Sequence, residues 1–347
     1  MLRECTNFWG GTAIVQEPPA IEKHYDVTYF PLSRQVWYDK DPNWGVYGAD
    51  GHLIDAAALR RGNSTPPRLC GQSRVHAHPF PTEFDWAEDI EYIYMGCFIS
   101  HYGHYLCSTL VRLWPLLREG LNGRKLLLHA PNGPDHEFRI PYAAMTLEGL
   151  GLKPDDIVVF QEPRRIRRLI IPRPSFVEQL LGHHAHRDLC HRIGEQFLDG
   201  LDMTTALPPV YFSKTKLLGG VGRIGNESVI ENVLASNGIG IVYPEQLSLR
   251  EQVRLFAENR VIAGTGGTQL HTGILAPPVA RVVALSASHS VNSNLLLFDR
   301  LNDRTAGYVY DDRGYREMQN QDKFLTSDYL EDPEATAHDL LALIREL

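Results

Sequence analysis

The chain has 347 residues, of which 43% are hydrophobic and 22% charged, a composition typical of a globular protein with one large or two ordinary domains. Its net charge of −8 argues against a sequence-independent grip on nucleic-acid phosphates, so we expect no nucleic-acid partner. The sequence lacks a membrane-length apolar run and a signal-peptide core, and its five scattered cysteines form no CxxC pair, so we expect a cytoplasmic protein with reduced thiols.

The first part of the chain, 1–175, is predicted to be an α/β domain with a β-rich start. Residues 46–54 read as a hairpin whose turn is Asp50-Gly51. Further along, apolar runs alternate with helical patterns. Strands are expected at 93–99, 125–129 and 157–160, a short strand at 169–171 and a helix at 141–150. We place the domain boundary after residue 175, within a helix-like connector over 175–205.

A histidine-containing turn follows the strand at 93–99. Its sequence is Ser100-His101-Tyr102-Gly103-His104-Tyr105, and a helical pattern of leucines comes next. Histidine titrates near neutral pH and can take a proton from a hydroxyl group. Two histidines three residues apart at such a turn are also consistent with simple helix caps. We therefore regard His104 and His101 as candidate catalytic residues.

Three other polar patterns receive structural interpretations, so no metal site is predicted. Asp39-Lys40-Asp41 has the DxD form that holds divalent metals, but Pro42 follows it and a solvated turn fits better. His186 and Cys190 would share a helix face, as zinc ligands can, yet no second pair of ligands is evident, so a polar face is favoured. The basic run 164–168 is interpreted as a solvated cluster, with anionic lipid or an acceptor phosphate as the alternative partner.

The second part of the chain, 176–347, is predicted to be a nucleotide-binding domain. Apolar strand-like runs alternate with helical patterns through short links over 209–285, which indicates a parallel sheet covered by helices. Such sheets bind ligands at the carboxyl ends of their strands. The amphipathic tail, 332–347, is predicted to be a helix that packs back toward the first domain.

A glycine-rich loop, 219–225, follows the first strand of this domain. Its glycines satisfy G-x-G-x-x-G, and Glu245 lies where a ribose-binding carboxylate would belong, which makes an NAD-dependent oxidoreductase one hypothesis. However, six residues separate Ser213 from the first fingerprint glycine, whereas the fingerprint needs its turn directly after the strand. A looser loop that carries Lys214 and Arg223 instead suits a diphosphate wrapped by charged side chains.

A second glycine-rich loop, 264–271, follows a later strand and opens a helical pattern. Backbone N–H groups at a helix N-terminus attract anions, and the glycines let a phosphate approach closely. For His271, a buried structural role is as well supported as a functional one when the residue is taken alone. The loop's candidate ligand-binding residues are Gly264, Thr265, Gly266, Gly267, Thr268, Gln269 and His271.

Taken in order, these elements resemble glycosyltransferase family 61 over roughly 92–290. The resemblance rests on Tyr211-Phe-Ser-Lys214, Arg223, Asn226-Glu227, Tyr243-Pro-Glu245, Leu247-Ser248, Glu251-Gln252-Val253, the 264–271 loop, and a segment that places His104, Tyr105 and Arg112 on family positions. The chain departs from the family in having Lys214 for an arginine and Gly267-Thr268-Gln269 for Ala-Gly-Leu. It also has Ser108 where the family often has a carboxylate.

The resemblance implies a GT-B fold, in which two Rossmann-like domains face each other across a cleft and no metal or cofactor is bound. It implies an inverting hexosyl- or pentosyltransferase of the bacterial capsule and surface-polysaccharide type. The donor would be a nucleoside-diphosphate sugar, with UDP as the expected nucleotide, and the acceptor a glycan or lipid-linked saccharide at the inner membrane. The implied donor-site residues are Ser213, Lys214, Arg223, Asn226, Glu227, Glu245 and the 264–271 loop, and His104 is the implied base. A catalytically silent nucleotide- or sugar-binding subunit is the non-enzyme alternative, because Ser108 replaces the acid.

Overall fold

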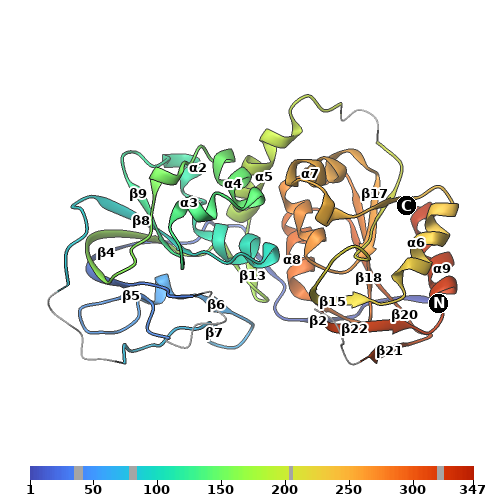
Figure 1. Cartoon of the computed structure of the whole chain (residues 1–347), viewed down its shortest axis with the longest axis horizontal. Helices are drawn as coiled ribbons and strands as arrows, with labels where there is room; N and C mark the ends of the chain where they lie inside the picture. Colours follow the sequence, from blue (N-terminus) through green and yellow to red (C-terminus); the bar gives the residue numbers. More distant parts are fainter. Residues whose placement is uncertain (35–41, 78–83, 203–205, 319–323) are drawn as a thin grey trace. The chain divides into compact units, whose positions relative to one another are not determined.

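The computed structural model describes residues 1–34, 42–77, 84–202, 206–318 and 324–347, which divide into two compact units (Figure 1). The N-terminal unit is Gly10–Ile193, and the C-terminal unit is Met1–Trp9 together with Gly194–Leu347. The division falls later than the predicted boundary after residue 175, because strands beyond that residue pair with one near the start of the N-terminal unit. Met1–Trp9 leave the predicted first domain because they pair with strands of the C-terminal unit.

The N-terminal unit is built on a six-stranded sheet in the order β10-β9-β8-β11-β4-β5. The first four of these strands are parallel, β4 runs antiparallel to β11, and β5 pairs antiparallel with β4 at the edge. In chain order the parallel strands lie 3-2-1-4, so the winding direction reverses between β8 and β11. The strands are β4 (Ile21–Phe30), β5 (Gly45–Tyr47), β8 (Glu91–Cys97), β9 (Lys125–His129), β10 (Ile157–Val158) and β11 (Arg164–Pro172). The basic run 164–168 and the short strand expected after it are therefore one strand, β11.

Shorter elements complete the N-terminal unit. After β8 the chain forms an interrupted helical run in place of the single predicted helix. Two small sheets are formed by β3 (Ala13–Val15) with β12 (Phe176–Val177) and β13 (Leu181–His183), and by β6 (Arg60–Arg61) with β7 (Arg68–Leu69). The helical segments are η1 (Asp55–Ala57), α1 (Tyr102–His104), η2 (Tyr105–Thr109), η3 (Leu110–Arg112), α2 (Leu116–Glu119), α3 (Pro134–Glu137), α4 (Pro141–Gly149) and η4 (Pro154–Asp156), while α5 (His184–Leu198) runs through the division between the units.

The C-terminal unit contains a second six-stranded sheet, in the order β1-β20-β18-β17-β14-β16. Its five C-terminal strands are parallel and lie 2-1-3-4-5 from β16, while β1 is antiparallel at the other edge. The winding therefore reverses between β14 and β17. β17 is buried throughout, which explains why its sequence is continuously apolar or small. The strands are β1 (Leu2–Glu4), β14 (Val210–Phe212), β16 (Gly240–Val242), β17 (Val261–Thr265), β18 (Arg281–Ser286) and β20 (Ala306–Asp311).

The tail helix forms as predicted but packs on a different surface. Figure 1 shows α9 beside α6, and its residues Leu340, Leu341 and Ile344 belong to the core of the C-terminal unit. Its amphipathic pattern required an apolar partner, and one face of the unit's own sheet together with α6 supplies it. The helical segments here are η5 (Pro244–Gln246), η6 (Thr268–Leu275), α6 (Glu227–Ser236), α7 (Leu249–Glu258), α8 (Ser293–Leu301) and α9 (Pro333–Glu346). No helix among the described residues is both long and apolar enough to cross a membrane.

The loop 219–225 departs most from its prediction. Gly220–Ile224 form strand β15, which pairs in parallel with β22 (Phe324–Leu330) and, through it, with β21 (Tyr315–Met318). Strand β19 (Ser290–Asn292) forms a separate pair with β2 (Asn7–Trp9). Two of the three fingerprint glycines, Gly220 and Gly222, therefore belong to a small sheet separate from the main one, and Gly225 follows that strand directly.

Buried histidines should make the protein sensitive to acid. His129 is fully buried: Tyr94 donates to its Nδ1, and its Nε2 donates to the Phe30 carbonyl. Burial lowers the pKa of His129 to about 3 and that of His186 to about 3. In the unfolded chain the pKa of a histidine is near 6.5. Below that pH the two histidines are therefore protonated in the unfolded state but stay neutral in the folded state. Stability should fall as the pH drops toward 3, by about 1.4 kcal/mol per pH unit for each histidine.

Urea unfolding of the wild type and of His129→Gln, at several pH values from 7.5 to 4.5, measures this effect. The variant's loss of stability over that range should be smaller by about 2–4 kcal/mol, whatever its absolute stability at neutral pH. Parallel pH curves for the two proteins would contradict the assignment.

Candidate functional site

Two segments of the C-terminal unit that were predicted to bind the donor meet where the strand order of their sheet reverses. They are the residues after β14 and the 264–271 loop after β17. Lys214 follows β14, and Gly266 follows β17, its immediate neighbour. The Lys214 Nζ donates a hydrogen bond to the Gly266 carbonyl at 2.8 Å. Burial lowers the pKa of Lys214 to about 8, although the nearby Glu227 carboxylate opposes this shift. An ammonium group is thereby held at the carboxyl ends of two parallel strands, where sheets of this type bind their ligands.

Glu227 holds this region together. It begins α6, is 1% exposed, and accepts hydrogen bonds from the Tyr211 hydroxyl at 2.9 Å and from the Lys214 backbone N–H at 3.1 Å. The Thr265 hydroxyl also donates to it. Burial raises the pKa of Glu227, and these donors together with the Lys214 charge oppose that rise. Contact between Glu227 and a donor ribose is therefore not supported, because both carboxylate oxygens already have protein partners.

Gly267 gives the Lys214 side chain its room. A Cβ atom at this position would lie 2.5 Å from the Lys214 Nζ and 2.7 Å from the Gln269 Oε1. The backbone at Gly267 is extended, so the glycine is required by space and not by its φ angle. Gly264 is similarly constrained, since a Cβ there would lie 2.7 Å from the Phe212 carbonyl oxygen.

The remaining residues of the two segments are partly engaged in structure. Ser213 is fully buried and forms a turn by accepting from the Thr215 N–H at 3.0 Å. Gln269 donates its side-chain amide to the Thr265 carbonyl. His271 is 6% exposed and packs edge-on against Phe298, so it lies in the core of the unit. Thr268, at the start of η6, remains partly exposed.

The G-x-G-x-x-G pattern has a packing role here. A Cβ at Gly225 would lie 2.3 Å from the Tyr329 ring, and one at Gly222 would lie 2.9 Å from the Thr326 hydroxyl. These glycines let β15 lie close to β22. A dinucleotide fingerprint requires a turn between strand and helix, whereas two of the three glycines are within a strand. The NAD hypothesis therefore loses its structural basis.

Arg223 lies on the same small sheet, and Asn226 lies just after it, at the start of α6. The Arg223 guanidinium stacks over Phe324 at 4.7 Å, and its Nε donates to the Ser327 hydroxyl at 3.0 Å. Asn226 both donates to and accepts from the backbone of Leu330, at 2.9 and 3.1 Å. Asn226 thus anchors the end of β22 through the Leu330 backbone. The Arg223 side chain is oriented by Phe324 and Ser327 of β22.

Glu245 lies just beyond β16, the neighbour of β14, and it is exposed. Partial burial raises the pKa of Glu245, as does the charge of Glu231. A separate open groove of about 480 Å³ lies between β16 and α7, lined by Tyr243, Leu247 and Arg254 among others. Lys214 and the 264–268 loop do not line this groove, so it is distinct from the Lys214 region.

The N-terminal unit contains a second polar cluster, also where its sheet reverses. His104 follows β8, and Glu178 follows β11, its parallel neighbour. The His104 Nδ1 donates to the Glu178 Oε1 at 2.8 Å, and the Ser108 hydroxyl donates to the same oxygen at 2.6 Å. The Arg61 guanidinium lies 3.7 Å from Oε2. Because His104 and Ser108 are four residues apart, they reach Glu178 from one helical face.

Glu178 is a buried carboxylate whose charge is compensated. It is 2% exposed, and burial alone would raise its pKa, yet His104, Ser108 and Arg61 bring the pKa below its ordinary value. The His104 side chain, in contrast, is 26% exposed. The carboxylate therefore stays charged behind an imidazole that solvent can reach.

His101 lies next to this pair. Its ring centre is 5.1 Å from that of His104, and its backbone carbonyl accepts from the Tyr105 N–H. The surrounding protein lowers the pKa of His101, and the neighbouring His104 lowers it further. The structure thus brings the two predicted histidines together.

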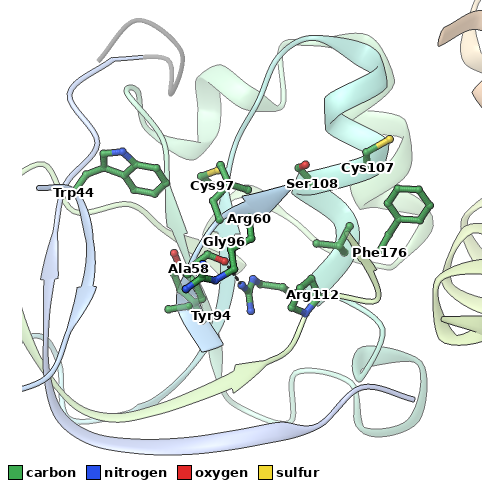
Figure 2. A pocket seen from close by; sticks show the side chains of 14 residues that line it. Trp44, Ala58, Arg60, Tyr94, Gly96, Cys97, Cys107, Ser108, Arg112 and Phe176 are labelled. Atoms are coloured by element: carbon green, nitrogen blue, oxygen red, sulfur yellow. Dashed lines mark hydrogen bonds between the residues drawn. The ribbon is translucent and has the colours of Figure 1, made fainter. Parts of the chain in front are cut away.

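Arg112 has a structural role, although the resemblance aligns it with an arginine of the family. It is 4% exposed and donates to the carbonyls of Pro172 and, at 3.2 Å, Ala58. It lines a cavity of about 20 Å³ together with Cys97 and Ser108 (Figure 2). That volume accommodates a water molecule and not a sugar. The cavity is therefore part of the scaffold beneath the His104 cluster.

The three polar patterns that the sequence analysis interpreted as structural are the basic run 164–168, the pair His186 and Cys190, and Asp39-Lys40-Asp41. Arg165 and Arg167 of the basic run stack on Trp86 at 4.0 and 4.4 Å, and Arg168 pairs with Asp89 at 3.1 Å. His186 and Cys190 are fully buried, so the predicted polar helix face is wrong: it belongs to the core. Asp39-Lys40-Asp41 lies outside the described residues. Within the described ranges, no group of three or more His, Cys, Asp or Glu residues is arranged to hold a metal.

Glu178 and Arg61 were missed in the sequence. Glu178 lies in Phe176-Val-Glu-Gln179, which has no recognisable motif and falls in the segment interpreted as a connector. The usable signal was topological, since Glu178 follows the strand that neighbours β8 across the reversal. That strand order is not apparent from the sequence alone.

A comparison with protein families gives a match over the middle of the chain. The family model Glycosyltransferase 61 matches residues 102–283, just over half of the chain, and its range includes His104, Glu178 and the Lys214 region. No curated protein sequence matches the chain significantly. The chain belongs to glycosyltransferase family 61 and is a glycosyltransferase.

Proposed function

We propose that this glycosyltransferase transfers a sugar, with inversion, from a nucleoside-diphosphate sugar to a hydroxyl of a glycan or lipid-linked acceptor. The observation that supports this most is that each sheet carries its polar cluster at its winding reversal, the usual ligand position. One cluster is organised around an ammonium group and the other around a histidine. These groups suit the departure of a diphosphate and the deprotonation of a hydroxyl, respectively.

Lys214 would stabilise the negative charge that develops on the departing diphosphate. The backbone amides of Gly267 and Thr268 and the Thr268 hydroxyl would add donors after β17, whereas the Gly266 N–H already donates to the Leu285 carbonyl. Because Arg223 is stacked on Phe324, we assign it a secondary contact and make Lys214 the principal cation. Glu245, beyond β16, remains available for a ribose hydroxyl.

His104 would act as the general base. Its Nδ1 is occupied by Glu178, so Nε2 would accept the acceptor's proton as the hydroxyl oxygen attacks the anomeric carbon. The bond between that carbon and the donor's phosphate oxygen breaks on the opposite face, which inverts the configuration. His101 would help to shape the acceptor's approach.

Finer parts of the proposal rest mainly on the family. They are a GT-B arrangement of the two units, a UDP-linked hexose or pentose, independence from metals and other cofactors, and a role in bacterial capsule or surface-polysaccharide synthesis. A cytoplasmic location with peripheral contact at the inner membrane belongs with them. The basic run on β11 adds little support for that contact, because Trp86 and Asp89 already engage it. The catalytically silent alternative rested on Ser108, and it weakens because Glu178 supplies a carboxylate to the same cluster.

A thermal-shift screen with UDP, GDP, CDP, ADP, dTDP and NAD, with and without EDTA, tests the proposal. Stabilisation by one nucleoside diphosphate, unchanged by EDTA, is expected and would identify the donor class. Stabilisation by NAD alone would overturn the transferase donor site.

Gly267→Ala should weaken nucleotide binding more than it affects folding. The new methyl group displaces the Lys214 Nζ, whose flexible side chain can move at small cost to stability. Affinity for the nucleoside diphosphate found in the screen should fall about tenfold or more. Calorimetric titration measures it, with Gly307→Ala as the control because a Cβ there meets nothing within 4 Å. Equal affinities in both variants would remove Lys214 from phosphate binding.

A further inference from the structure

Glu178 and His104 form a pair that sequence motifs do not reveal. Glu178 contacts His104 through its carboxylate, and it comes from the turn after β12. An ionised carboxylate can only accept, so the 2.8 Å contact requires the proton to be on Nδ1 of His104. The neutral imidazole is thereby set with Nε2 as the acceptor.

The surroundings of Glu178 keep it charged and fixed. Ser108 donates to the same oxygen as His104, and Arg61 approaches the other oxygen. The main chain is also fixed, because the Glu178 carbonyl accepts from the Gly62 N–H at 2.8 Å and the Gln179 carbonyl from the Gly11 N–H at 2.7 Å. A buried carboxylate with three side-chain neighbours, on a main chain held at two points, resists reorientation, as a positioning group must.

We propose that Glu178 is the positioning residue for His104: it fixes the Nδ1–H tautomer and stabilises the imidazolium that forms when Nε2 takes the acceptor proton. Ser108 occupies the helical position where an acid would be expected, and its hydroxyl connects that position to Glu178. The acid function has thus moved from the helix after β8 to the turn after β12. This inference rests on the proposed role of His104.

The first test reads the tautomer and needs no nucleotide. In protein labelled with ¹⁵N-histidine, the His104 signals are assigned by comparison with His104→Ala. At a pH where the ring is neutral, Nδ1 should carry the proton in the wild type. Glu178→Leu, which removes the acceptor at similar volume, should shift His104 toward the Nε2–H form. Nε2–H in the wild type, or no change in the variant, would overturn the proposal.

The second test measures coupling. Glu178→Gln should lower the rate of sugar transfer, measured as nucleoside diphosphate formed, about 10²–10³-fold, with little change in donor binding. The double variant with His104→Ala should be no slower than His104→Ala alone, since the pair acts as one unit. If the rate loss of the double variant equals the product of the losses of the two single variants, Glu178 has a merely structural role.

Glu22→Gln is the matched control. Glu22 also contacts a histidine, His24, at 3.1 Å and an arginine, Arg173, at 2.7 Å, but it lies on β4 and is a third exposed. The Glu22→Gln variant should have a sugar-transfer rate within about threefold of the wild type. The nuclear magnetic resonance result stands even if the nucleotide screen fails, so failure of this inference and failure of the proposed function are distinguishable.

Discussion

Replacing His104 with alanine is expected to slow sugar transfer about 10²–10⁴-fold while leaving nucleotide binding nearly intact. The imidazole is the partly exposed member of its cluster, and its position after β8 belongs to the N-terminal unit, whereas the Lys214 region belongs to the other. Loss of the base should therefore lower kcat without raising the donor's Kd. Release of the nucleoside diphosphate measures the rate, and calorimetry measures the affinity.

His24→Ala provides a close control for this experiment. Its side chain is 28% exposed against 26% for His104, and it too contacts a glutamate, Glu22, at 3.1 Å. Wild-type activity in His24→Ala together with a large loss in His104→Ala would localise the effect to the turn after β8. Full activity in His104→Ala would remove that residue from the mechanism.

Glu227→Ala is expected to lower the free energy of unfolding by about 3–5 kcal/mol, because it leaves buried donors without their acceptor. Tyr211, Thr265 and the Lys214 main chain all lose the carboxylate that connects β14, β17 and α6. The loop bearing Lys214 loses its anchor as well, so nucleotide affinity should fall together with stability. Urea unfolding and nucleotide titration on the same preparations measure both quantities.

Glu231→Ala, on the same face of α6 one turn later, separates this network from general effects on the helix. Glu231 accepts from the Thr215 hydroxyl at 2.6 Å in an exposed setting, so its loss should cost less than about 1 kcal/mol. Similar losses for the two variants would show that Glu227 has no special role in the sheet.

Elements with strong local patterns were predictable. The run at 125–129 is a strand with the predicted bounds, and Ser248 caps α7 through its exchange with Glu251. Lys214 and the 264–268 loop were both expected at the carboxyl ends of parallel strands, although their contact also depends on the strand order β16-β14-β17. These features depend on residues close in the chain or on one simple rule of sheet topology.

What depends on distant partners was not predictable. The 219–225 loop resembled a phosphate loop because β22, the strand that explains its glycines, lies about a hundred residues later in the chain. The tail helix showed an apolar stripe, but a stripe does not specify the surface that it covers. Glu178 had no motif at all and acquired its significance only when β11 was seen to lie beside β8.

The pairing of Met1–Trp9 with the far end of the chain has a consequence for synthesis. β1 and β2 are made before the N-terminal unit, yet β20 and β19, their partners, are made after it. The N-terminal unit has its complete sequence and can fold while the C-terminal sheet still lacks one edge. Completion of that sheet therefore closes a loop around an entire folded unit, and a fragment beginning at Gly194 would expose the edge of β20 that β1 normally covers.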